Sequence, residues 1–115
     1  MNHFHVWVNL KPEADPREFS HTAQEFLGYL HAHELIEGYY LARREFMISP
    51  PSLGEYHVTI EFASTDQINR AFAAMEDQDN QEVQGFYRPV ADLLRDVWVA
   101  MYRDFPESVP LSKRG

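Results

Sequence analysis

Two segments of the chain alternate strictly between apolar and other side chains. In residues 3–10 every even position is apolar, and in residues 55–62 the even positions are again apolar. Because successive side chains of a strand point to opposite faces, each segment predicts a strand with one face in a core. A wet face that carries Trp and His predicts a cleft or a subunit interface rather than open solvent. The odd positions on these faces are His3, His5, Trp7 and Asn9 in the first segment, and Glu55, His57, Thr59 and Glu61 in the second.

The composition limits the classes of function. The 115 residues suit one domain with a single core. A net charge of −8, from 10 basic and 18 acidic residues, opposes binding to nucleic acid or to an anionic membrane. The absence of cysteine excludes disulfides, thiolate catalysis and Cys-ligated metal sites. Neither a signal peptide nor an apolar run of the roughly 20 residues needed to span a bilayer is visible, so we expect a cytoplasmic protein.

Capping residues mark two helices. Asp15 is expected to cap a helix whose first residue is Pro16 and which ends near His33. Ser64, followed three residues later by Gln67, predicts the start of the second helix. Further strands are predicted over residues 39–47 and 96–103. Between the second helix and the last strand we expect a polar loop over 77–84 and a short helix over 87–94 that begins near Pro89.

The element order is therefore β-α-β-β-α-(short α)-β. Such a chain is expected to form an α+β, ferredoxin-like fold: a four-stranded antiparallel sheet with the helices on one face and the first strand between the third and fourth. We expect one domain over residues 1–106 and a C-terminal tail over residues 107–115. The predicted core between sheet and helices consists of Val6, Val8, Phe26, Leu30, Val58, Ile60, Phe72, Val97 and Val99.

The other sheet face is left without helices. It is expected to carry aromatic side chains from the first and last strands, Trp7, Trp98 and Tyr102 among them. Because exposed apolar patches mark interfaces or binding grooves, and no element of the chain remains to cover this one, we predict a homodimer.

Besides the element order, four segments are informative: residues 9–12, 37–39, 54–57 and 102–106. With these segments the chain resembles the dimeric α+β barrel superfamily, and within it small uncharacterised bacterial proteins near the stress-responsive A/B barrel group. The resemblance covers roughly residues 3–106 and implies a homodimer whose two sheets enclose a cavity. That superfamily includes cofactor-free monooxygenases, isomerases, haem enzymes and proteins without known activity. No motif is specific to an active branch, so neither a catalytic role nor a cofactor is transferred.

The candidate site lies on the open face, where His5 and His57 are expected to meet. Two histidines and a carboxylate suit zinc or ferrous iron, but no short ligand spacing is present and we predict no metal site. The alternative role for these histidines is as hydrogen-bonded groups in a cavity or a dimer seam. Of the adjacent Arg43 and Arg44, at most one is expected to reach the cavity, where it pairs with an internal acid or receives a carboxylate. The residues predicted to bind ligand are His5, Trp7, Asn9, Glu55, His57, Trp98 and Tyr102.

Two functions follow from this face. The first is binding of a small apolar or amphipathic molecule in a cavity on the uncovered sheet face. The second is a cofactor-independent oxygenase or isomerase that uses a cavity histidine, His5 or His57, as acid or base. RNA recognition, which also uses this fold, is disfavoured because Leu53 and Glu55 stand where a basic and a stacking residue are needed.

Overall fold

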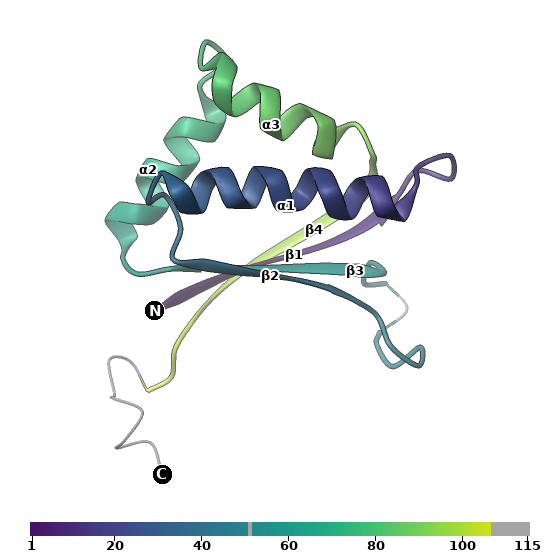
Figure 1. Cartoon of the computed structure of the whole chain (residues 1–115). Coiled ribbons are helices and arrows are strands. Elements are labelled where there is room, and N and C mark those ends of the chain that lie inside the picture. Colours follow the sequence, from purple (N-terminus) through teal and green to yellow (C-terminus); the bar gives the residue numbers. More distant parts are fainter. Residues whose placement is uncertain (51, 107–115) are drawn as a thin grey trace.

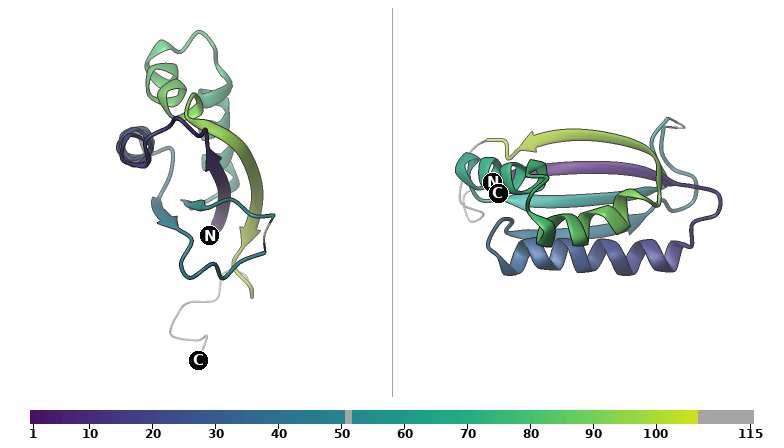
Figure 2. Two further views of the ribbon diagram at one scale, coloured as in Figure 1. Left: turned by 90° about the vertical axis from the view of Figure 1, so that its right-hand side faces the viewer. Right: turned by 90° about the horizontal axis from the view of Figure 1, so that it is seen from above.

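The computed structural model describes residues 1–50 and 52–106. The four strands form one antiparallel sheet in the order β2-β3-β1-β4, and the three helices lie on one of its faces (Figures 1 and 2). This is the ferredoxin-like arrangement that the sequence predicts. The predicted tail at 107–115 lies outside the described residues. The elements are β1 (Asn2–Leu10), α1 (Pro16–Ala32), β2 (Gly38–Arg43), β3 (Tyr56–Phe62), α2 (Thr65–Glu76), α3 (Gln81–Ala91) and β4 (Leu94–Arg103).

Both predicted helix starts are confirmed. The Asp15 carboxylate accepts a hydrogen bond from the backbone N–H of Arg17 at 2.9 Å, and Ser64 Oγ accepts one from the N–H of Gln67 at 3.1 Å. These bonds satisfy N–H groups that have no partner within the helix. Helix α1 ends at Ala32, with His33 as its C-cap, as expected.

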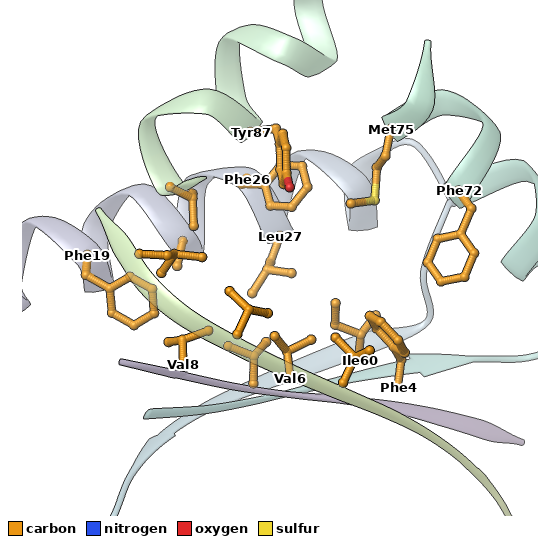
Figure 3. Close-up of a pocket in the computed structure, with 16 residues that line it drawn as sticks. Phe4, Val6, Val8, Phe19, Phe26, Leu27, Ile60, Phe72, Met75 and Tyr87 are labelled. Atoms are coloured by element: carbon orange, nitrogen blue, oxygen red, sulfur yellow. The ribbon is translucent and has the colours of Figure 1, made fainter. Parts of the chain in front are cut away.

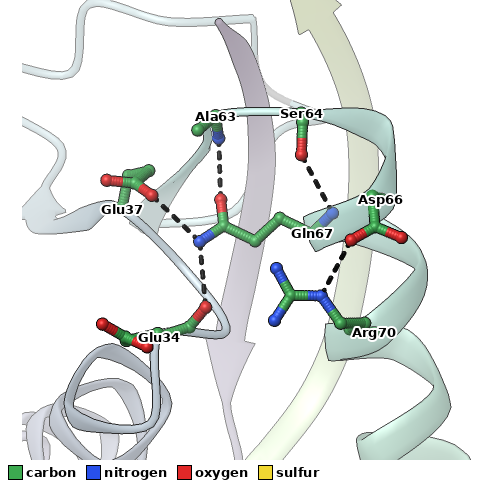
Figure 4. A network of polar contacts seen from close by, with 7 residues as sticks. All are labelled: Glu34, Glu37, Ala63, Ser64, Asp66, Gln67 and Arg70. Carbon is green, nitrogen blue, oxygen red and sulfur yellow. Dashed lines mark hydrogen bonds and ion pairs between the residues drawn. The ribbon is translucent and has the colours of Figure 1, made fainter.

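The buried Gln67 side chain fastens the start of α2 to the connection between α1 and β2 (Figure 4). Its Oε1 accepts from the N–H of Ala63 at 2.7 Å, and its Nε2 donates to the carbonyl of Glu34 and to Glu37 Oε1, both at 3.1 Å. A buried amide is tolerated when its hydrogen-bonding groups find partners. Gln67 therefore acts as a structural residue at this end of the sheet.

Several element boundaries differ from the prediction, among them the end of α3, at Ala91 and not at residue 94, and the start of β4, at Leu94 and not at residue 96. Strand β2 ends at Arg43 and not at residue 47, because Phe46 and Met47 adopt left-handed backbone conformations with φ of 55° and 58°, which no strand accommodates. Helix α3 begins at Gln81, within the predicted loop. The missed signal is Asn80, whose side chain caps the N–H of Val83 at 3.2 Å. Pro89 lies in the last turn of this helix and not at its start.

The predicted core is confirmed under α1 and over β3, but it does not reach β4. Phe26, Leu30, Val58 and Ile60 are buried together, with Val8 in an adjoining cluster. Val6 and Phe72 are half-buried, whereas Val97 and Val99 are 51% and 59% exposed, so their assignment to the core was wrong. They lie opposite Val8 and Val6 and so share the helix-facing side of the sheet. That side stays uncovered at the edge strand, because α1 and α2 pack toward β2 and β3.

A glycine places the start of β3 close to β1. A Cβ atom on Gly54 would lie 2.5 Å from the carbonyl oxygen of Val8, a distance that real side chains do not reach. Glycine therefore allows the β2–β3 connection to press on the β1 backbone. As a result, the N–H of Glu55 reaches Asn9 Oδ1 at 3.0 Å.

Candidate functional site

The strand register brings the predicted site residues onto one sheet face. Trp7 lies opposite His57 on one side and Trp98 on the other, and His5 lies opposite Thr59 and Ala100. Since directly opposed residues share a face, these side chains all lie on the side without helices. The alternation in the sequence predicted this grouping.

His5 and His57 meet directly. Nδ1 of His5 is 2.8 Å from Nε2 of His57, and the ring planes differ by 8°. In such a pair one nitrogen donates and the other accepts, so the two rings share a single proton along this hydrogen bond. Trp7 lies nearly parallel to His57, with ring centroids 5.0 Å apart, and Tyr102 meets His5 edge-on at 5.2 Å.

The environment favours the neutral form of both imidazoles. Partial burial lowers the pKa of His5, and the nearby His3 lowers it further. Burial also lowers the pKa of His57, with an additional contribution from His5. Because an ordinary histidine titrates near 6.5, both rings are mainly neutral at pH 7. The pair can therefore accept a proton at neutral pH.

Asn9 and Glu55 are engaged within the protein. Asn9 accepts from the N–H of Glu55 and donates through Nδ2 to Asp96 Oδ2 at 3.2 Å. The Glu55 carboxylate accepts from Nε of Arg43 at 2.6 Å, which is the internal acid pairing considered for this arginine. These two predicted ligand-binding residues thus tie β3 to its neighbours, which leaves them less capacity to bind a ligand.

A small pocket lies on the open face beside Trp7. Its volume is about 170 Å³, and Trp7, Glu55 and His57 line it together with residues of the β2–β3 connection. Arg43 and Arg44 both line it, contrary to the prediction that only one could, because the chain leaves the sheet after Arg43. His5, Asn9, Trp98 and Tyr102 do not contribute to this pocket. Trp98 and Tyr102 remain 38% and 59% exposed on the same sheet face.

A larger, apolar cavity lies on the opposite side of the sheet, between the strands and the helices (Figure 3). It measures about 270 Å³, and its sixteen lining side chains include Val6 and Val8 from β1, Ala23 and Phe26 from α1, and Tyr87 from α3. The Tyr87 hydroxyl is the sole oxygen and the Met75 sulfur the sole other heteroatom among these side chains. Val97 and Val99 also line the cavity, so its wall along β4 is exposed.

The sequence pattern does not predict this cavity. Alternation identifies which side chains share a sheet face, but it does not say how closely the helices approach that face. The available signal was β4 itself, which is apolar on both faces: Val97, Val99 and Met101 on one, Trp98 and Tyr102 on the other. A lone edge strand of that composition indicates that both of its faces meet apolar material.

Among residues 1–50 and 52–106, no group of three or more His, Cys, Asp or Glu side chains could hold a metal ion. In the same part of the chain, no helix combines the length and the apolar character needed to cross a membrane.

The fold and the open face define a ferredoxin-like α+β protein. The chain belongs to a family of unknown function, DUF6614, whose model matches residues 1–113. No curated protein matches it.

Solved structures share the fold at low sequence identity. The Arabidopsis thaliana protein At3g17210 matches with a TM-score of 0.70 and 14% identity, over 96% of this chain and 100% of that one. SnoaB, a cofactor-independent oxygenase from Streptomyces nogalater, matches with a TM-score of 0.67 and 14% identity, over 92% and 97%. A dimeric ferredoxin-like protein of unknown function from Bacteroides fragilis matches with a TM-score of 0.59 and 15% identity, over 88% and 93%. At these identities the matches establish the fold and leave the activity open.

Proposed function

We propose that the protein binds a small apolar molecule in the cavity between the sheet and the helices. The observation that carries this proposal is the cavity's size together with its lining: about 270 Å³ bounded almost wholly by carbon. An apolar cavity of ~150 Å³ stays dry and takes up benzene in another protein. The Tyr87 hydroxyl is the main hydrogen-bonding partner that this lining offers to water, so the cavity favours an apolar ligand. The sequence predicts a small apolar or amphipathic ligand on the uncovered sheet face; the proposal here is an apolar ligand on the opposite face, which the helices cover.

The same proposal includes a homodimer formed through the open sheet face. The structurally similar Bacteroides fragilis protein is described as dimeric, and this face carries Tyr40, Trp98 and Tyr102 at 65%, 38% and 59% exposure. Covering them would remove apolar surface from water at roughly 25 cal/mol per Å². The sheet would then separate a ligand cavity on one face from a subunit contact on the other.

A titration with naphthalene tests the ligand site. The methyl resonances of Val6, Val58 and Leu27, which line the cavity, are expected to shift in a saturable way. Ala23 is buried and also lines the cavity, so Ala23→Leu places three more carbons in the space and should weaken naphthalene binding by at least tenfold.

The matched control is Ala42→Leu, the same substitution on β2 at a position that lines the open-face pocket. It should leave naphthalene binding unchanged. Non-saturable shifts, or equal effects of the two substitutions, would contradict a ligand site between sheet and helices.

The second candidate function is acid–base catalysis, as in a cofactor-independent oxygenase or isomerase. The observation that favours it is the neutral His5–His57 pair, which can take a proton at pH 7. Against it, the histidines lie on the open face and the apolar cavity on the other, so no histidine lines the cavity. Binding without histidine chemistry is therefore the function that the geometry supports better.

A further inference from the structure

Arg44 lines the open-face pocket without an acidic partner. Its Nη1 donates to Ser49 Oγ and to the Leu53 carbonyl, both at 3.3 Å, and its side chain is half-buried. A guanidinium has five N–H donors in a planar fork, and these two contacts use only one of its nitrogens. No carboxylate in the described part of the chain forms an ion pair with it.

The charges around the pocket leave an excess of one positive charge. Glu55 lines the pocket too, but Arg43 neutralises it through a contact of 2.6 Å. His57 adds no charge at pH 7, since its pKa is lowered by burial and by His5. Arg44 is then the uncompensated charge of this pocket, in a chain whose overall charge is −8. A local positive excess on an acidic protein favours a small anion over a cation at this position.

The remaining wall of the pocket is aromatic. Trp7 lines the pocket together with His57 and lies nearly parallel to the imidazoles of His57 and His5, at 5.0 and 5.6 Å between centroids. Flat rings pack well on an indole face. The volume of about 170 Å³ is close to the ~150 Å³ that holds benzene elsewhere, and it is well below that of drug-sized sites.

We propose that this pocket binds a small planar carboxylate, of the size of a single aromatic ring with one acidic group. The ring lies against Trp7, and the carboxylate accepts hydrogen bonds from the free donors of Arg44. Charge-assisted bonds from a guanidinium to a carboxylate are often bidentate and fix the ligand's orientation. This site is separate from the apolar cavity, since the sheet lies between them, and in the proposed homodimer it would face the sheet of the partner subunit.

Calorimetric titration of the full-length protein with benzoate tests the proposal, with benzamide as the neutral probe of the same shape. Benzoate is expected to bind at least tenfold more tightly than benzamide, because hydrogen bonds to a charged group are the stronger ones. Benzoate should also shift the indole N–H resonance of Trp7. Equal binding of the two probes, or no binding of benzoate, would overturn the proposal.

Variants separate the charge of Arg44 from its role in the loop. Arg44→Gln is expected to lower benzoate affinity at least tenfold, whereas Arg17→Gln, at an exposed position on α1, should leave it unchanged. Ser49→Ala removes a loop contact of Arg44 but keeps the guanidinium, so benzoate should still bind. If Ser49→Ala weakens binding as much as Arg44→Gln, the shape of the loop and not the charge selects the ligand, and the proposal fails. Naphthalene binding should persist in Arg44→Gln, which distinguishes the two sites.

Discussion

The hydrogen bond between His5 and His57 favours a particular charge state of the two imidazoles. His5 Nδ1 and His57 Nε2 share one proton at 2.8 Å, and protonation of both rings would put an N–H on each of these nitrogens and two positive charges side by side. The groups that face them are His3 from β1, Tyr102 from β4, Thr59 and Glu61 from β3, and Trp7. His3 is held by Asp104 at 2.7 Å, and that hydrogen bond lowers the pKa of the Asp104 carboxyl. Burial and the neighbouring histidines lower the pKa of both rings, so the neutral form of the pair is favoured.

Acidification is expected to destabilise the fold through this pair. The folded-state pKa of both histidines lies below 6.5, so near pH 6 the unfolded chain binds more protons than the folded one. The stability contributed by the neutral pair is fully present above about pH 6.5 and is lost as the pH falls below that value. The urea midpoint should accordingly fall between about pH 7.5 and pH 5.5, at fixed protein concentration.

Substitution of one ring tests the assignment. His5→Phe removes the shared proton and should flatten this pH dependence, whereas His31→Gln, at an exposed position on α1, should not. A slope that survives His5→Phe unchanged would place the responsible protonation elsewhere in the molecule.

For the strands, hydrophobic periodicity predicted which side chains share a face of the sheet, but it did not predict how much of that face the helices cover. Asp15 and Ser64 predicted the starts of their helices correctly, because an N-cap hydrogen bond joins residues within four positions of each other in the sequence. Val97 and Val99 alternate as core residues do, yet they are exposed, because α1 and α2 pack toward β2 and β3. In the candidate site, alternation predicted that His5, His57 and Trp7 share a face, and the ferredoxin-like strand order, with β1 beside β3, brought them together. The cavity depends on the spacing between layers, which no local pattern records.

Two substitutions on the helix-facing side of the sheet compare a position that the helices cover with one that they leave exposed. Ile60 is 8% exposed, so Ile60→Ala should cost about 2–5 kcal/mol of unfolding free energy, mostly through lost packing. Val99, at 59% exposure, should cost less than about 1 kcal/mol when replaced by alanine. Urea denaturation gives both values. Similar losses at the two positions would mean that material absent from the single protomer covers β4.

At the scale of the whole molecule, adjacent residues of β4 offer a matched test of the proposed dimer. Trp98 and Val99 point to opposite sheet faces, and both are exposed in the protomer, at 38% and 59%. We expect the parent protein to be a dimer by light scattering at micromolar concentration. Trp98→Glu should yield a monomer, because a carboxylate would have to be buried unpaired between two sheets. Val99→Glu carries the same charge on the helix side and should remain dimeric. A monomeric parent, or dissociation by Val99→Glu alone, would rule out pairing through the open face, since the subunits would then not meet there.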